Sequence, residues 1–275
     1  MNRSSRIQSL PPLLEVIRRF DLSPRKSLGQ NFLLDLNITN RIARIGGDLT
    51  QYNIIEIGPG PGGLTRALLN NRAKQITTVE RDPRCVAAIH ELAAHFPNKL
   101  KIVEGDALKT RVQDLAEPPI QIIANLPYNI ATPLLLSWLR DLDGITHLVL
   151  MFQREVADRL AAKPGTKAYG RLSVITQWLC EVRPAFNLPK RAFIPPPKVI
   201  STVIELKPRP NPLAKAQFES LEAVTAAAFG QRRKMLRSSL KSLDINPAKA
   251  GIDPTRRAEE LMPEEFCALA RLINT

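Results

Sequence analysis

The sequence predicts an α/β protein with a mostly parallel sheet covered by helices on both faces, followed by a small all-helical domain. Apolar runs rich in β-branched residues alternate with helix-like stretches over most of the chain, which is typical of βαβ units. A proline-rich tract near residue 208 interrupts this alternation, and only helix-like patterns follow it. At 275 residues the chain is long enough for one large and one small domain.

Five apolar runs are expected to form the parallel strands. They lie at residues 54–57, 76–79, 100–103, 120–124 and 147–152. Residues 193–204 begin as a polyproline segment and continue into β-branched residues, which predicts a strand that closes the sheet. Three prolines at alternate positions in residues 207–212 predict a linker. We therefore expect domains at residues 1–207 and 208–275.

The charge balance indicates the kind of partner. Lys and Arg number 39 against 26 Asp and Glu, and the formal net charge is +13. This favours binding to nucleic acid over binding to a membrane surface. No apolar run reaches the length of a membrane span, and we expect a cytoplasmic protein. Residues 1–14 nevertheless contain arginines and serines without acids, a composition shared with organelle transit peptides.

Three cysteines, Cys85, Cys180 and Cys267, stand far apart and form no C-x-x-C pair. This spacing predicts neither a disulfide framework nor a zinc site, and it fits a reducing compartment. We expect no metal in the protein.

A glycine-rich turn follows the first expected strand. Residues 56–63 read EIGPGPGG, and Gly58 and Gly60 let a ligand approach the backbone where a Cβ would collide with it. The turn alone is also compatible with a nicotinamide enzyme, because the spacing from Gly58 to Gly63 satisfies G-x-G-x-x-G.

Carboxylates stand at the ends of the next two expected strands. Glu80 lies about twenty residues beyond the glycine turn, where an acid accepts hydrogen bonds from a ribose. Asp106 follows the third strand, and the two acids together with the turn predict a nucleoside pocket. Taken singly, either acid also fits a helix cap or a solvated loop.

The fourth strand is followed by Asn-Leu-Pro-Tyr. Pro127 cannot continue a strand ladder, so it ends the strand and leaves Asn125 and Tyr128 at the carboxyl edge of the sheet. Open α/β sheets bind ligands at that edge. As an isolated tetrapeptide, the motif also fits an ordinary turn with a packing aromatic.

These motifs, in this order, resemble the class I, Rossmann-like methyltransferases that use S-adenosylmethionine to methylate amines. Residues 30–35, QNFLLD, narrow the resemblance to the ribosomal RNA adenine dimethyltransferase family. Its small-subunit group is similar at residues 169–174 (YGRLSV), 193–199 (FIPPPKV) and 229–234 (FGQRRK). The likeness extends over roughly residues 25–240.

The resemblance implies S-adenosyl-L-methionine as cofactor and dimethylation of the N6 amines of two adjacent adenosines near the 3′ end of small-subunit ribosomal RNA. The substrate would be a pre-assembled small subunit, and we expect the enzyme to act as a monomer. The implied cofactor-binding residues are Asn31, Leu33, Gly58, Gly60, Glu80, Asp106 and Asn125. The implied catalytic residues are Asn125, Leu126, Pro127, Tyr128 and Phe193.

The catalytic motif suits a weakly nucleophilic amine. The adenine amine delocalises its lone pair into the ring, and hydrogen bonds from it to the Asn125 amide oxygen and the Leu126 carbonyl favour the tetrahedral, nucleophilic form. Pro127 stiffens the loop. Tyr128 is expected to stack on the base, and Phe193 on its other face.

The C-terminal region is expected to bind RNA through a helix. Phe229, Leu236, Leu240 and Leu243 fall on one apolar face of that helix. The basic residues expected to contact phosphates are Arg232, Arg233, Lys234, Arg237 and Lys241. A solvated surface is the alternative interpretation for each of them.

Three other functions fit parts of the pattern. One is another adenine methyltransferase, acting on large-subunit RNA or on DNA. A second is a non-catalytic nucleic-acid-binding protein on the same fold, against which the intact residues 125–128 argue. The third is a nicotinamide oxidoreductase.

Overall fold

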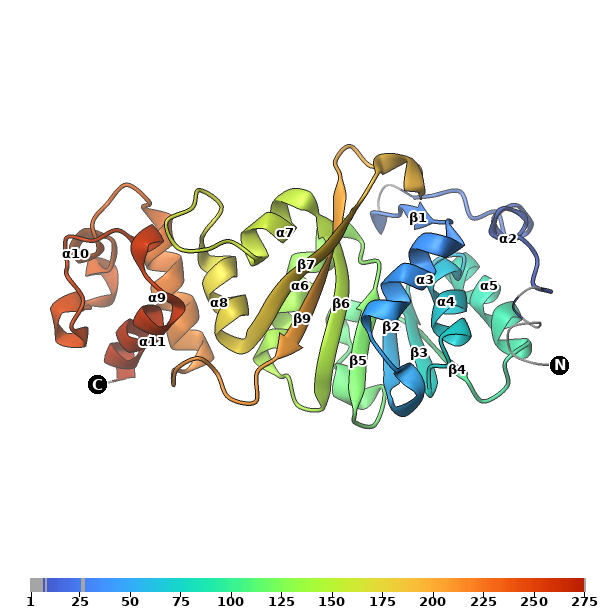
Figure 1. Cartoon of the computed structure of the whole chain (residues 1–275), viewed down its shortest axis with the longest axis horizontal. Coiled ribbons are helices and arrows are strands. Elements are labelled where there is room, and N and C mark those ends of the chain that lie inside the picture. Colours follow the sequence, from blue (N-terminus) through green and yellow to red (C-terminus); the bar gives the residue numbers. More distant parts are fainter. Residues whose placement is uncertain (1–6, 8, 26–27, 275) are drawn as a thin grey trace. The chain divides into compact units, whose positions relative to one another are not determined.

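The computed structural model describes residues 7, 9–25 and 28–274. In this part of the chain, seven strands form the main sheet (Figure 1). Their spatial order is β4 (Leu100–Glu104), β3 (Gln75–Glu80), β2 (Asn53–Ile57), β5 (Ile120–Ala124), β6 (Ile145–Gln153), β9 (Ser201–Pro208) and β7 (Cys180–Leu188). Strands β4 to β6 in this order pair in parallel, whereas β9 pairs antiparallel with β6.

The five expected parallel strands are confirmed, and none of their ends differs by more than two residues. Every residue of β2 and β5 is buried, which explains why these strands are mostly apolar. The chain runs outward from β2 through β3 and β4 and then returns to place β5 on the other side of β2. Such a reversal of strand order opens a crevice at the carboxyl ends of the strands.

Helices flank this sheet. Those next to β2 to β5 along the chain are α3 (Leu36–Ile45), α4 (Gly63–Asn70), α5 (Pro83–Ala94) and α6 (Tyr128–Arg140). Ile42, Leu68 and Ile89 from the first three helices share one hydrophobic core with Ile54 and Ile76 of the sheet. Helix α6 buries its own apolar side and contacts β6. The predicted fold class is therefore confirmed.

The segment at residues 193–204 differs from the expected single strand. Phe193 and Ile194 form β8 (Phe193–Ile194), which pairs antiparallel with β1 (Phe32–Leu33), and β9 begins only at Ser201. The prolines between the two strands have no backbone N–H to donate to a ladder, so they separate β8 from β9. At its other end β9 continues to Pro208, which had been expected in the linker.

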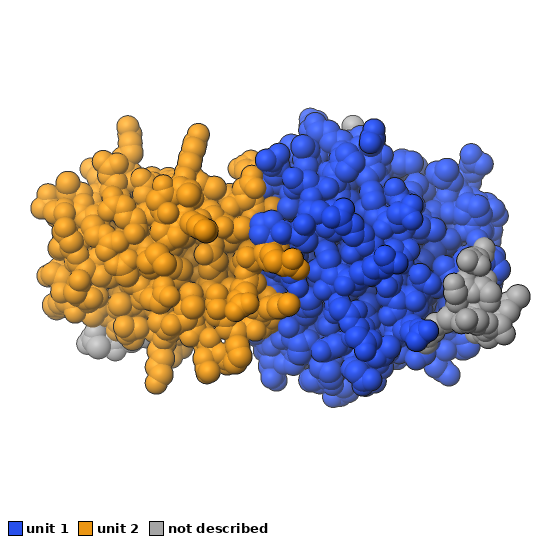
Figure 2. Space-filling view, viewed as in Figure 1, with its two compact units in different colours: residues 1–154, 184–206 blue, residues 155–183, 207–275 orange. Residues whose placement is uncertain are grey.

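The chain divides into two compact units (Figure 2). Unit 1 contains residues 1–154 and 184–206, and unit 2 contains residues 155–183 and 207–275. The chain passes from unit 1 to unit 2 between residues 206 and 207, one residue before the expected boundary between residues 207 and 208. The expectation nevertheless assigned residues 155–183 to the first domain, whereas they pack in unit 2.

Unit 2 is built from helices around its own core. They are α7 (Arg154–Leu160), α8 (Arg171–Leu179), α9 (Phe218–Gly230), α10 (Leu236–Ser239) and α11 (Pro263–Ala270). Tyr169 has no exposed surface, and its hydroxyl donates to the Leu261 carbonyl oxygen at 2.9 Å. Its ring packs edge-on against Phe229, which also contacts Phe266. These contacts explain why residues 155–183 belong with the C-terminal helices.

The single amphipathic helix expected over residues 229–243 is not formed. Helix α9 ends at Gly230, a turn follows, and the four-residue α10 begins at Leu236. Leu236 and Leu240 are nevertheless buried in the core of unit 2. The apolar spacing was thus correctly interpreted as core-facing, but two separate elements produce it.

Two further observations concern the described part of the chain. None of its helices is both long and apolar enough to cross a membrane. Cys85, Cys180 and Cys267 are all buried and form no disulfide.

Candidate active site

A cavity lies at the carboxyl ends of β2, β3, β4 and β5. Each of these strands contributes to its lining through the residues that end or follow it: the Gly58–Gly60 turn, Glu80, Asp106 and the Asn125–Tyr128 motif. The N-terminal segment adds a further wall, residues 28–33. The structure thus brings all seven predicted cofactor-binding residues to one cavity.

The glycine turn lets the backbone pass close to β1. A Cβ on Gly60, whose φ is +54°, would lie 3.0 Å from the Phe32 ring. A Cβ on Gly63 would lie 2.6 Å from the Leu33 carbonyl oxygen, closer than side chains approach backbone. These glycines therefore allow β1 to seat against the turn and helix α4, where Leu33 lines the cavity.

Glu80 is held in place by the backbone around it. Its Oε1 accepts the backbone N–H groups of Arg81 and Asp82, both at 2.8 Å. Its Oε2 accepts the Gly60 N–H at 3.3 Å, which joins the end of β3 to the glycine turn. Burial raises the pKa of Glu80, because a buried carboxylate loses solvation. The result is a fixed acceptor at the cavity wall.

Asp106 forms a helix cap, which was the alternative interpretation of this residue, and it also lines the cavity. Its Oδ1 accepts the Leu108 N–H at 3.0 Å and so caps a short 3-10 helix, Ala107–Lys109. Its Oδ2 lies 3.6 Å from Nη1 of Arg81. The cap fixes the carboxylate, and its second oxygen remains an acceptor beside the cavity that both residues line.

The amide of Asn125 has a defined orientation. Its Nδ2 donates to the Asn31 carbonyl oxygen at 3.2 Å, and the Asn31 side chain donates to the Gly29 carbonyl oxygen at 3.3 Å. With its nitrogen engaged in this way, Asn125 presents Oδ1 as an acceptor. Asn31 and Asn125 are thus coupled directly, although 94 positions separate them in sequence.

Pro127 and Tyr128 of the Asn125–Tyr128 motif are also fixed in position. Pro127 is the N-cap of α6 and Tyr128 is its first residue. The Tyr128 hydroxyl is hydrogen-bonded to the Ser201 hydroxyl at the start of β9. Burial raises the pKa of Tyr128. Its position is therefore set from both the parallel and the antiparallel parts of the sheet.

Phe193 is not brought to the cavity. Its exposed fraction is 1%, and it lies in the main hydrophobic core, paired in the ladder with Leu33. It is therefore not among the residues that line the cavity, although its ladder partner Leu33 is.

Glu56 was missed as a site residue. It lines the cavity, has an exposed fraction of 1%, and accepts a hydrogen bond from the Thr65 hydroxyl at 2.7 Å. Burial raises its pKa to about 8, and the nearby charge of Glu80 acts in the same direction. The signal in the sequence was an acid at the penultimate position of a mostly apolar strand, two residues before the first glycine of the turn.

The predicted RNA-binding residues lie in unit 2 around the break between α9 and α10. Arg232 is engaged within the fold, where Nη2 donates to the carbonyl oxygens of Lys167 and Tyr169 at 3.0 and 3.2 Å. The other four residues are exposed: Arg233, Lys234, Arg237 and Lys241. Because α9 ends at Gly230, these residues do not lie on one continuous helix, as had been expected.

The fold and the cavity define the class of protein. The structure is similar to a dimethyladenosine transferase from Plasmodium falciparum, with a TM-score of 0.75 and 25% identity, covering 87% of this chain and 96% of that one. It is also similar to the 23S rRNA methyltransferase ErmE, with a TM-score of 0.66 and 27% identity, covering 89% and 100%. The fold is that of a class I methyltransferase.

The sequence comparisons narrow this class to a family. The sequence model described as ribosomal RNA adenine dimethylase matches residues 22–275. The chain is 61% identical over 268 residues to ribosomal RNA small subunit methyltransferase A of Rhodospirillum rubrum, covering 96% of this chain and 93% of that protein. It is 54% identical over 278 residues to the protein of the same name from Mesorhizobium japonicum, covering 97% and 99%. The chain belongs to the ribosomal RNA adenine dimethylase family.

Proposed function

We propose that this protein dimethylates the N6 amines of two adjacent adenosines near the 3′ end of small-subunit ribosomal RNA, with S-adenosylmethionine as methyl donor, during ribosome biogenesis. One observation carries the proposal: the strand-end groups suited to a nucleoside cofactor and the Asn125–Tyr128 motif line the same cavity. The 61% identity to a protein named for the small subunit favours that RNA over the large-subunit alternative.

The cavity fits the cofactor on structural grounds. A Cβ at Gly58 would come no nearer than 3.6 Å to Pro127, and one at Gly105 would meet nothing within 4 Å, so the backbone is open at both turns. Between them, Glu80 offers an acceptor for ribose hydroxyls and Asp106 one for an adenine amine. S-adenosylmethionine, when bound there, supplies an electrophilic methyl group. Asn31 and Leu33 would enclose it from the N-terminal side.

The residues of the chain then act on the target amine. In the first transfer, Asn125 Oδ1 and the Leu126 carbonyl oxygen accept its two N–H groups, and in the second transfer one of them accepts the single N–H that remains. These contacts favour the tetrahedral nitrogen with a localised lone pair. The hydrogen bond to the Asn31 carbonyl keeps the Asn125 oxygen, rather than its nitrogen, available for this task. Alignment of the nitrogen with the methyl group supplies the rest of the rate enhancement, and no side-chain nucleophile is needed.

The base is held by Tyr128, which we propose stacks on the flipped adenine. Such stacking contributes about 1–3 kcal/mol per base. The stacking role expected for Phe193 has no support in its burial. We propose instead that Phe193 stabilises β1 from behind and so helps to hold Leu33 at the cavity.

Recognition of the RNA is proposed to use exposed basic residues of unit 2, chiefly Arg233 and Arg237, while Arg232 holds the turn that carries them. Phosphate contacts position a substrate without reading its sequence, so the presented adenosines and the shape of the RNA must provide specificity. We further propose that the protein acts as a cytoplasmic monomer on a pre-assembled small subunit. Its buried free cysteines support a reducing compartment.

Substitution of Asn125 tests the proposed mechanism. In Asn125→Ala we expect the rate of methyl transfer to fall by about 100-fold or more, because a donor or acceptor used in the transition state is lost. Binding of S-adenosylhomocysteine, measured by calorimetry, should weaken much less. Asn70→Ala, an exposed change at the end of α4, is the matched control and should leave both quantities unchanged. Equal losses of rate and binding in Asn125→Ala would refute the role assigned to this amide.

A further inference from the structure

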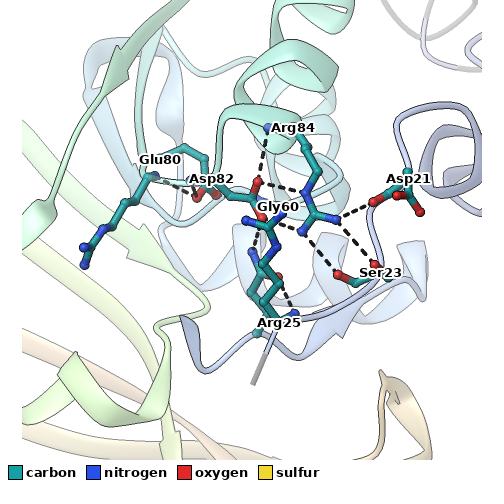
Figure 3. A network of polar contacts seen from close by, with 9 residues as sticks. Asp21, Ser23, Arg25, Gly60, Glu80, Asp82 and Arg84 are labelled. Atoms are coloured by element: carbon teal, nitrogen blue, oxygen red, sulfur yellow. Dashed lines mark hydrogen bonds and ion pairs between the residues drawn. The ribbon is translucent and has the colours of Figure 1, made fainter. Parts of the chain in front are cut away.

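A polar network joins the end of β3 to the N-terminal segment of the chain (Figure 3). At its centre is Asp82, which caps helix α5 by accepting the Arg84 backbone N–H at 3.1 Å. The Asp82 side chain has no exposed surface. A cap alone would use one oxygen of this carboxylate, but the network uses both.

Arg84 binds Asp82 through two parallel contacts. Its Nε lies 3.1 Å from Oδ1 and its Nη2 lies 2.7 Å from Oδ2. The remaining donors reach the N-terminal segment, where Nη1 donates to the Asp21 carbonyl oxygen at 2.5 Å and Nη2 to the Ser23 carbonyl oxygen at 3.2 Å. A planar guanidinium can serve all four acceptors in one geometry, which an ammonium group cannot.

Gln30 forms the second connection to the same carboxylate. Its Nε2 donates to Oδ2 of Asp82 at 3.1 Å, and its Oε1 accepts the Arg25 backbone N–H at 2.8 Å. Asp82 therefore anchors the N-terminal segment at two places along the chain. The hydrogen bonds from Arg84, and then Gln30, hold the pKa of Asp82 at about 2, so the anchor stays charged.

Both ends of this network reach the candidate active site. The Asp82 N–H donates to Oε1 of Glu80 at 2.8 Å, beside the proposed ribose position. On the other side, Gln30 is followed by Asn31, whose carbonyl oxygen accepts Nδ2 of Asn125. Hydrogen bonds thus connect Asp82 to the wall formed by residues 28–33, and that wall to the Asn125 amide.

We propose that Asp82 and Arg84 are positioning residues that hold residues 28–33 as a wall of the cofactor cavity and, through Asn31, orient Asn125. The inference rests on the proposed function, because it takes the cavity as the cofactor site. A buried ion pair contributes little net stability, since desolvation offsets the attraction, whereas it fixes geometry well. The structural alternative is a stabilising clamp without influence on the site.

Arg84→Lys separates these two roles. Lysine keeps the charge and one bond to Asp82 but cannot also reach Asp21 and Ser23. We expect the dissociation constant of S-adenosylhomocysteine, measured by calorimetry, to rise about tenfold, as for the loss of one or two hydrogen bonds. The unfolding temperature should change by less than about 4 °C. Amide hydrogen exchange in residues 21–25 and 28–33 should become faster in the unliganded protein.

Arg19→Lys is the matched control. Arg19 also ties the N-terminal region to α5, through contacts of 2.7 and 2.9 Å to Glu91, but this pair is exposed and does not line the cavity. We expect the dissociation constant to stay within about twofold of the unmodified protein, because exposed ion pairs contribute little. Equal weakening in both variants would overturn the proposal, since any anchor of the segment would then suffice.

The remaining outcomes are equally decisive. If Arg84→Lys binds S-adenosylhomocysteine as the unmodified protein does and its hydrogen exchange is unchanged, the proposal is wrong. Asp82→Asn provides a second variant with the same expected direction. If the unmodified protein fails to bind S-adenosylhomocysteine at all, the proposed function fails, which distinguishes that result from a failure of the positioning role.

Discussion

Replacing Glu80 by glutamine should weaken cofactor binding without weakening the fold. Oε1 of Glu80 accepts two backbone N–H groups at 2.8 Å, so the glutamine oxygen must take that position. The amide nitrogen then replaces Oε2, facing the Gly60 N–H and the proposed ribose. A donor stands where the cofactor needs an acceptor, and the charge is lost as well.

The size of the effect follows from the bonds involved. A hydrogen bond to a charged group contributes about 1.5–3 kcal/mol, which corresponds to about 10- to 150-fold in a dissociation constant. The unliganded protein should behave differently. Burial raises the pKa of Glu80, so above pH 4.5 the folded state holds a proton more readily than the unfolded state and is destabilised as the carboxylate ionises. Glutamine carries no charge to desolvate, which offsets the loss of the hydrogen bond from the Gly60 N–H at 3.3 Å, so the unfolding temperature of the variant at pH 8 should stay close to that of the unmodified protein.

Calorimetric titration with S-adenosylhomocysteine and thermal unfolding without ligand measure the two effects. Glu104→Gln is the matched control, because Glu104 pairs with Glu80 across the ladder but is exposed and does not line the cavity. That variant should bind normally. If Glu80→Gln binds as tightly as Glu104→Gln, the carboxylate does not hold the ribose and the reasoning is refuted.

Other groups lead to further expectations. The pKa of Glu56 is about 8 in the folded protein, against an ordinary value of 4.5, so the stability of the protein should fall as the pH rises between these values. Glu56→Gln should flatten this decline when unfolding temperatures are measured across pH 5–9. An unchanged slope would contradict the burial argument. The double variant Arg233→Glu with Arg237→Glu should weaken RNA binding and lower the slope of log affinity against log salt by about 1–2. The charge-matched control is Arg72→Glu with Lys74→Glu, in the exposed turn before β3, and it should change neither quantity. Equal effects of the two pairs would show that only the total charge matters.

Local patterns were sufficient to predict the parallel sheet and the place of the site. Strands β2 and β5 are buried throughout, so their apolar runs stand out from the surrounding sequence. Because parallel strands end at one edge, each residue that follows a strand was predicted to meet the others, and Glu80, Asp106 and Asn125 do line one cavity.

Contacts between distant segments were not predictable in this way. Phe193 belongs to a two-residue strand that exists only because it pairs with Phe32–Leu33. The spacing of Phe229, Leu236 and Leu240 suits one helix, but packing around Tyr169 satisfies it with two separate elements. Nothing in a local pattern distinguishes these outcomes, because the deciding contacts come from residues far apart in sequence.

The polar anchor was missed for a related reason. Asp82 has the position of an ordinary helix cap, and it does form one. Its carboxylate also binds Gln30, 52 positions away in sequence, and Arg84, two positions away. Only the folded chain shows that both side chains meet at this one carboxylate.

Transfer of a labelled methyl group from S-adenosylmethionine to small ribosomal subunits that lack dimethylated adenosines tests the account most directly. After digestion of the RNA to nucleosides, we predict that the label is found in N6,N6-dimethyladenosine and that Asn125→Ala slows its appearance by about 100-fold or more. Label in a different nucleoside, or no transfer by a protein that binds both S-adenosylhomocysteine and the subunit, would contradict the proposed function.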